Sequence, residues 1–271
     1  MATGTPNPQQ LTSPVRFRRR VGALTPGQLA TLRHAFATSM TVSDDTGYAY
    51  WAGIHGLPLP ISCGNAHGTP YFLPWHRAYL YLFEKSLQDL VPDVTLPWWD
   101  WTSALSHIEG IPAAYTDTTP DNPLLRGRVA IERNFITQLR QTPGLLSGGA
   151  NPTTVRDPGE PDDLPRARSV DSVLDAPTFL DFSIRLENIH DDVHGWVGGS
   201  MSRVPIAAFD PVFWAHHAMI DRLWYLWETQ HQNAKPPASL MNRALDPFPM
   251  TVAQTIDISQ LGYDYAVAAI Q

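Results

Sequence analysis

The histidines of this chain are concentrated in two parts of the sequence, and their spacing suits metal binding. The N-terminal group comprises His55, His67 and His76, and the C-terminal group comprises His190, His194, His216 and His217. His190 and His194 are four residues apart, so on a helix they project from one face and can share one ion. Each group can supply three imidazoles, and neutral imidazole binds copper, zinc, iron or nickel. The sequence therefore predicts a two-metal site, and the spacing alone leaves the metal open.

Composition narrows the class of protein that carries this site. The chain has 271 residues, of which 43% are hydrophobic, so we expect residues 1–271 to form a single domain core. Its formal net charge of −7 argues against a general nucleic-acid partner. No apolar run approaches the roughly 18 residues of a transmembrane helix, so no membrane partner is expected. With one cysteine, Cys63, the chain can form neither an intrachain disulfide framework nor a thiolate metal cage.

The histidines must be positioned by helices, because apolar residues recur at helical spacing and strand signals are few and short. Thr25, Pro26 and Gln28 match a capping box with proline at the first helical position. The predicted helices run from Thr25 through Met40, from Asp44 or Asp45 to Gly56, from about Trp75 to Leu90, from near Thr178 to near His194, and from near Pro211 to near Gln230. We expect a mainly α fold, a four-helix bundle that houses the metal site between its helices.

Two long segments are predicted to be irregular loops. Residues 57–74 and about 110–175 are rich in proline and glycine, and the second contains one helical candidate at Ile131–Leu139. Within it, Gly148–Pro165 has the most loop-like composition. These segments connect the predicted helices of the one domain.

Three segments around the histidines resemble the copper-binding signatures of tyrosinases, catechol oxidases and molluscan haemocyanins. Residues 67–80 (HGTPYFLPWHRAYL) are similar to the first signature, and residues 210–224 (DPVFWAHHAMIDRLW) are similar to the second. Residues 187–199 (ENIHDDVHGWVGG) resemble the remainder of the second copper motif. The resemblance extends from about Arg18 to Tyr265, because Tyr263-Asp264-Tyr265 matches the Tyr-x-Tyr that often closes the core of this family.

The resemblance implies two copper ions and a role for each residue that matches a family position. One ion would be bound by His55, His67 and His76, and the other by His190, His194 and His217. His34 is the alternative to His55, whose surroundings vary most in the family, and His216 would lie beside the site without binding metal. Phe213 matches an aromatic gate over the metal pair. Glu187 resembles the carboxylate that orients a water for proton transfer from the phenol, and Asp221 resembles an orienting residue or an arginine partner.

The function implied by the resemblance is that of a type-3 copper oxidase. Such a protein converts o-diphenols, or related o-aminophenols, to o-quinones and reduces dioxygen to water. Asp191 stands where many monophenol-hydroxylating members carry asparagine. Its carboxylate could itself act as the base or could disfavour the usual arrangement of glutamate, asparagine and water, which places hydroxylation in doubt. The alternatives are a full tyrosinase that also hydroxylates monophenols, a haemocyanin-like oxygen carrier, and a zinc protein. A phenolic substrate and dioxygen are the implied partners, and copper delivery could require a chaperone chain; the sequence is silent on oligomeric state.

Further features give expectations of their own. Cys63 lies four residues before His67, so either a Cys63–His67 thioether or a plain buried thiol fits the sequence. Gly195, directly after His194, would leave one side of the pocket open to bulky rings. We expect no C-terminal shielding domain after Tyr265. The N-terminus lacks the order of a secretory signal, so a cytoplasmic location is the default expectation, although a chain exported with a partner would look the same.

Overall fold

The computed structural model describes residues 15–56 and 63–266, and most of its regular structure is helical. The longer helices, of eight or more residues, are α1 (Pro26–Thr41), α2 (Tyr48–His55), α3 (Phe72–Leu90), α7 (Ala167–Leu174), α8 (Phe179–Val197) and α10 (Val212–Gln230). The shorter ones are α4 (Ser106–Glu109), α5 (Ala113–Thr116), α6 (Arg133–Leu139), α9 (Val204–Ala207) and α11 (Ala238–Met241). The described chain also has two three-residue strands, β1 (Arg16–Arg18) and β2 (Tyr263–Tyr265). Short 3-10 helices lie at Val21–Ala23, Cys63–Asn65, Pro161–Asp163, Gly199–Ser202 and Val252–Thr255. The expected mainly α fold with few short strands is confirmed.

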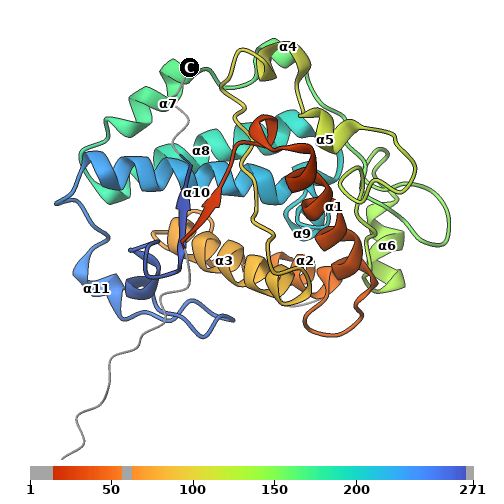
Figure 1. Ribbon diagram of the computed structural model, residues 1–271, viewed down its shortest axis with the longest axis horizontal. Helices are drawn as coiled ribbons and strands as arrows, with labels where there is room; N and C mark the ends of the chain where they lie inside the picture. Colours follow the sequence, from red (N-terminus) through yellow and green to blue (C-terminus); the bar gives the residue numbers. More distant parts are fainter. Residues whose placement is uncertain (1–14, 57–62, 267–271) are drawn as a thin grey trace, which may run out of the picture.

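Helix α10 forms the centre of the fold. It packs against α3 and α7, while α3 also contacts α1 and α8, and α2 contacts α1 and α9 (Figure 1). Every residue of α10 from Val212 to Trp224 is buried, as expected for a helix that other elements surround on all sides. Its Trp214 ring stacks on Phe83 of α3, with ring centroids 3.7 Å apart. These aromatic contacts fix α3 against α10, the two helices that carry His76 and His217.

Local hydrogen bonds explain where three of the long helices begin. The predicted capping box of α1 is present, with the Thr25 side chain accepting from the Gln28 N–H and the Gln28 side chain accepting from the Thr25 N–H. At α8, the Thr178 hydroxyl accepts from the Asp181 N–H at 3.2 Å. At α10, an Asp210 carboxylate oxygen accepts from the Val212 N–H at 3.0 Å. Each contact satisfies a first-turn N–H that has no partner within its helix.

Two predicted helix starts were wrong. Helix α2 begins at Tyr48 and not at Asp44 or Asp45, because the Asp44 carboxylate accepts from the backbone and hydroxyl of Thr46 and closes a turn before the helix. Helix α3 begins at Phe72, three residues before the predicted start. Pro74 then falls in the first turn, where its missing N–H is not needed.

The loop predictions were also only partly correct. The segment expected to be irregular over 110–175 contains α5 and α7 in addition to the helix at the predicted candidate site, α6. Of the loop predicted over 57–74, residues 57–62 lie outside the described part of the chain, and its last residues form the start of α3.

The two strands bring the ends of the described chain together. β1 and β2 pair in parallel, with Arg18 opposite Tyr265, and lie side by side in Figure 1. Arg18 is fully buried and donates to Glu84 of α3 and to Asp221 of α10. The pair therefore ties both ends of the described chain to α3 and α10. Within the described residues, no helix has the length and hydropathy required to cross a bilayer.

Candidate metal centre

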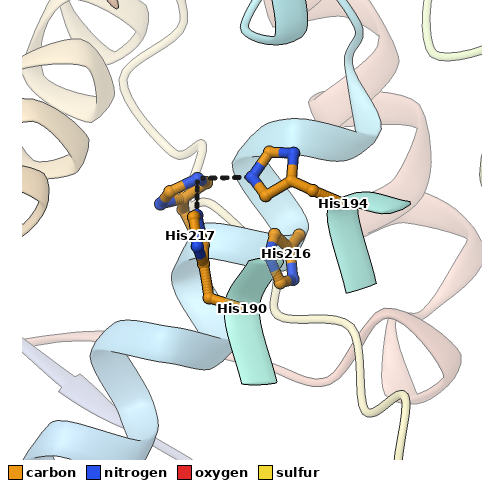
Figure 2. Close-up of side chains that lie close together, drawn as sticks. All are labelled: His190, His194, His216 and His217. Carbon is orange, nitrogen blue, oxygen red and sulfur yellow. Dashed lines mark hydrogen bonds between the residues drawn. The ribbon is translucent and has the colours of Figure 1, made fainter. Parts of the chain in front are cut away.

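The C-terminal imidazoles converge through their Nε2 atoms. His190 and His194 project from the same face of α8, and His217 projects from α10 toward them (Figure 2). The Nε2 atom of His217 lies 3.2 Å from Nε2 of His190 and 3.2 Å from Nε2 of His194. Three nitrogens bound tetrahedrally at about 2.0–2.1 Å from one ion would lie about 3.3 Å apart. The arrangement therefore has the dimensions of a three-imidazole metal site.

The N-terminal imidazoles form an adjoining group. His55 ends α2, His76 lies in the second turn of α3, and His67 comes from the segment before α3. Their ring centroids are 5.1–5.9 Å apart. Their three Nε2 atoms are buried and make no hydrogen bond within the described residues. Buried polar atoms without a partner are costly, so three of them in one place fit a site for a cation.

The two groups share one space. The rings of His76 and His217 have centroids 4.5 Å apart, and those of His67 and His190 are 5.5 Å apart. Ligand atoms of His55, His76 and His217 all lie within 4.8 Å of one another. The six predicted imidazoles therefore form one continuous cluster, in which the N-terminal triad (His55, His67 and His76) borders the C-terminal triad (His190, His194 and His217). The alternative residue His34 is exposed on α1 and belongs to none of the described ligand groups.

The Nδ1 atoms of five of these rings lie beside oxygen acceptors. The partners are the carbonyls of Val204 for His55, Phe72 for His76 and Met201 for His194, and the carboxylates of Glu187 for His67 and Asp191 for His190, at 2.8–3.1 Å. A neutral imidazole that donates its Nδ1–H keeps a lone pair on Nε2. These contacts therefore direct the Nε2 lone pairs inward, as second-sphere partners of metal-binding histidines do.

Two glycines allow the carbonyl partners to approach. A Cβ on Gly56 would lie 2.4 Å from the backbone of Pro205, so only glycine lets this segment lie against His55. Gly198 ends α8 with φ of +65°, in the left-handed region, and a Cβ there would lie 2.3 Å from the Asp157 carbonyl. The turn that follows Gly198 returns the Met201 carbonyl to His194.

His216 occupies a different position from its neighbour His217. It is fully buried beside His190 and His194, and its ring stacks on His190 with centroids 5.2 Å apart (Figure 2). Its ligand atom lies within 4.8 Å of those of the triad, so His216 extends the cluster to four rings. The Nε2 contacts of His217 run to His190 and His194, which leaves His216 outside the closest set.

Burial keeps the rings of the site neutral. It lowers the pKa of His55, His76, His190 and His217 well below 6.5, and neighbouring imidazoles lower these values further. For His194, burial lowers the pKa to about 4, although the bond to the Met201 carbonyl opposes the shift. Neutral imidazole is the form that binds metal. At neutral pH these rings can therefore bind an ion without first losing a proton.

The same shifts predict that the metal-free protein is sensitive to acid. Unfolded histidine takes up a proton near pH 6.5, whereas these folded rings do not until the pH is much lower. The contribution of these histidines to the free energy of unfolding is therefore fully present above pH 6.5. It is lost as the pH falls, by up to about 1.4 kcal/mol per pH unit for each such histidine. Urea unfolding of the metal-free chain at pH 8, 7, 6 and 5 should show this decline below pH 6.5.

A matched substitution tests this interpretation. Replacing the exposed His34 with glutamine should leave the pH dependence of the unfolding free energy unchanged. A free energy of unfolding that stays constant from pH 7 to pH 5 would show that the folded rings take up protons as readily as unfolded histidine does.

The acidic residues predicted at the site have different environments. Glu187 is 8% exposed, and its Oε1 accepts from the Gly68 N–H at 2.7 Å and lies 3.1 Å from Nδ1 of His67. Asp191 follows His190, and its side chain is 65% exposed. The structure therefore places Glu187 as a partner of an imidazole and Asp191 at the surface of the site.

Phe213 and Cys63 lie inside the protein. The Phe213 ring is fully buried and packs on His217 and His55, with centroids 4.1 and 4.8 Å away. Cys63 is buried beside the His55 carbonyl, and its ligand atom lies within 4.8 Å of those of His55 and His67. Burial raises the pKa of the Cys63 thiol to about 12, so it remains protonated at neutral pH.

A cavity of about 320 Å³ leads from the surface to the imidazoles. Its described lining consists of His55, His67, His190, Asp191, His194, Gly195, Met201, Ser202 and Val204. A Cβ on Gly195 would meet nothing within 4 Å, so the absence of a side chain there keeps that side of the cavity open. The sequence did not single out Met201, Ser202 or Val204, since their place depends on the turn after α8.

The comparisons with known proteins all indicate the same family. A family model described as the common central domain of tyrosinase matches residues 45–230. A tyrosinase from Streptomyces lincolnensis is 32% identical over 228 residues, which cover 74% of this chain and 79% of that protein. A G-type haemocyanin from Enteroctopus dofleini is 31% identical over 274 residues, which cover 90% of this chain but 9% of that much longer protein.

Solved structures agree with the sequence matches. A functional unit of octopus haemocyanin has a TM-score of 0.77 and 28% identity, over 92% of this chain and 68% of that one. A tyrosinase from Burkholderia thailandensis shares the fold, with a TM-score of 0.74 and 22% identity over 94% of this chain and 74% of that one. The chain therefore belongs to the tyrosinase family of type-3 copper proteins, whose common domain binds a dinuclear copper centre.

Proposed function

We propose that this protein is a copper oxidase that converts o-diphenols, or related o-aminophenols, to o-quinones and reduces dioxygen to water. The observation that carries the proposal is an open cavity of about 320 Å³ whose wall contains four of the six clustered imidazoles. A substrate ring can therefore reach the metal-facing nitrogens directly. In an oxygen carrier only dioxygen must reach them, so a cavity of this size favours turnover of an organic substrate.

Each copper would take one triad of Nε2 atoms. His55, His67 and His76 would hold the first ion, and His190, His194 and His217 the second. When bound, the copper pair would supply the two-electron redox chemistry between the phenol and dioxygen. Neutral imidazole ligands suit copper and leave the positive charge of the ions uncompensated by carboxylate. Phe213, packed on His55 and His217, keeps the inner side of the pair dry.

The two carboxylates would have separate tasks. Glu187 would hold the His67 ring in place through its Nδ1 contact, and the Gly68 N–H fixes the carboxylate for this task. Asp191 lines the cavity, so its carboxylate can take part in removing the phenolic proton as the substrate enters. Oxidation of one o-diphenol releases two electrons and two protons, and two such events reduce one dioxygen to two waters.

The test is oxygen uptake by the copper-loaded protein. We expect two coppers per chain by elemental analysis, and oxygen consumption with 4-methylcatechol in a ratio of one dioxygen to two catechols. Reversible oxygen binding by a two-copper protein that leaves 4-methylcatechol intact would identify a carrier instead. A chain purified with zinc that rejects copper would contradict both. A lag followed by turnover of p-cresol would establish hydroxylation of monophenols in addition.

A further inference from the structure

The described wall of the cavity carries a negatively charged side chain and no positively charged lysine or arginine. Among the described residues that line it, Asp191 carries the only carboxylate, and no lysine or arginine is present. Its side chain is 65% exposed, so water solvates the ionised carboxylate, although desolvation of its buried part raises the pKa of Asp191 above its ordinary value. One of its oxygens lies within 4.8 Å of the ligand nitrogens of His67 and His190. A negative charge therefore lies beside the position that a bound ring would occupy.

The other charged groups nearby are less able to act on a ligand in this cavity. Glu187 is 8% exposed and is absent from the described lining of the cavity. Asp192 is exposed on α8 but does not line the cavity. Arg203 lies between two lining residues in the sequence, yet it is exposed and outside the lining as well.

We propose that Asp191 selects among o-diphenols by the charge of the side chain opposite the two hydroxyls, favouring a cationic ammonium group over a carboxylate. This inference rests on the proposed oxidase function and names its substrate class. If the two hydroxyls of a catechol point to the metal-facing nitrogens, its para substituent points away from them toward the mouth of the cavity, whose described wall includes Asp191. An ammonium group there is attracted to the Asp191 carboxylate, and a carboxylate is repelled.

The effect should be moderate, because water reaches the cavity. One charge interaction over several ångströms near a protein surface corresponds to roughly a tenfold difference in kcat/KM between the two charge types. Salt should reduce this difference, since exposed charges are screened over about 8 Å at physiological ionic strength. A methyl group in the same position gives an uncharged reference.

The experiment compares three catechols that differ in one substituent. These are 2-(3,4-dihydroxyphenyl)ethylamine, 3,4-dihydroxyphenylacetate and 4-methylcatechol, assayed with the copper-loaded chain and its Asp191→Asn and Asp192→Asn variants. The two substitutions remove the same charge from adjacent positions, and only Asp191 lines the cavity. We expect the amine-to-acid ratio of kcat/KM to fall from about ten to near one in Asp191→Asn and to change less than twofold in Asp192→Asn.

Several outcomes would overturn the inference. Equal loss of the ratio in both variants would assign the preference to the overall negative charge of the protein. If Asp191→Asn lowers kcat/KM equally for all three catechols and leaves the amine-to-acid ratio unchanged, the residue acts in proton transfer alone. A wild-type preference for the acid that disappears in Arg203→Gln would place control on the arginine.

Binding measurements separate this inference from the proposed function. Calorimetric Kd values for the three catechols, measured without dioxygen on the copper-loaded chain with its copper reduced to Cu(I), give the same ratio without turnover. A ratio near ten that depends on Asp191, with no oxidation of any catechol, would contradict the oxidase and support the charge selection. Oxidation of all three catechols at equal kcat/KM and with equal Kd would support the oxidase and contradict the charge selection.

Discussion

A His217→Ala variant is expected to bind one copper per chain and to lose at least about 100-fold in oxidation of 4-methylcatechol, since loss of even a second-sphere partner of a metal ligand costs 10–100-fold. The Nε2 atom of His217 is the one that approaches both His190 and His194 at 3.2 Å. It also belongs to the ligand group of His55 and His76. Its removal therefore opens the C-terminal triad at the side that faces the other triad.

The measurement is copper content by elemental analysis together with oxygen uptake. Matched controls are His34→Ala and His231→Ala, because His34 is exposed on α1 and His231 lies in neither triad, at the end of α10. Both should keep two coppers and wild-type turnover. Two tightly bound coppers in His217→Ala would mean that another ring, with His216 the nearest by sequence, completes the second site.

The sequence allowed the helices with local signals to be predicted. The capping box at Thr25 and the acid and proline at Asp210-Pro211 marked true helix starts, because the bonds concerned lie within three residues. Asp44 carried the same type of signal but closes a turn with Thr46. An aspartate before a helix can cap it or close a turn, and only the packing of the following segment decides. Helix α7 was missed inside a segment whose composition predicted a loop.

The site was only partly accessible to sequence reasoning. The separation of four between His190 and His194 fixed their common face, and the histidines predicted to converge do lie together. The contacts that orient the rings could not be predicted, since Val204 and Met201 act through backbone carbonyls that any residue possesses. Their approach depends on tertiary contacts that involve glycines.

Asp221 gives the largest effect expected on stability. It lies one turn after His217 on α10 and accepts from Arg18, Arg77, Tyr263 and Tyr265. Burial alone would raise the pKa of Asp221, but Arg77 and Arg18 outweigh burial and lower it. An Asp221→Ala variant leaves both arginines buried beside an empty position, although each retains one glutamate partner. We expect a loss of about 3–5 kcal/mol in the free energy of unfolding, measured in urea.

Two comparisons check that the effect comes from the buried position. Asp162→Asn removes an exposed pair with Arg166 and should change the unfolding free energy by less than about 1 kcal/mol. Asp221→Asn keeps the size of the side chain and some hydrogen bonds, so its loss should be smaller than that of Asp221→Ala. A change below about 1 kcal/mol in Asp221→Ala would show that water replaces the carboxylate.

The position of Asp221 also links stability to the metal centre. Arg77 follows His76 on α3, and its Nε lies 2.5 Å from the Asp221 carboxylate, so one ion pair joins a helix of each triad. If this pair sets how α3 and α10 face each other, Asp221→Asn should weaken binding of both coppers even at pH 7 and low temperature, where the variant is fully folded. If the pair contributes only to folding, the folded variant should bind copper as tightly as the wild type. Copper titration of the folded protein therefore separates a role in positioning His76 and His217 from a role in stability alone.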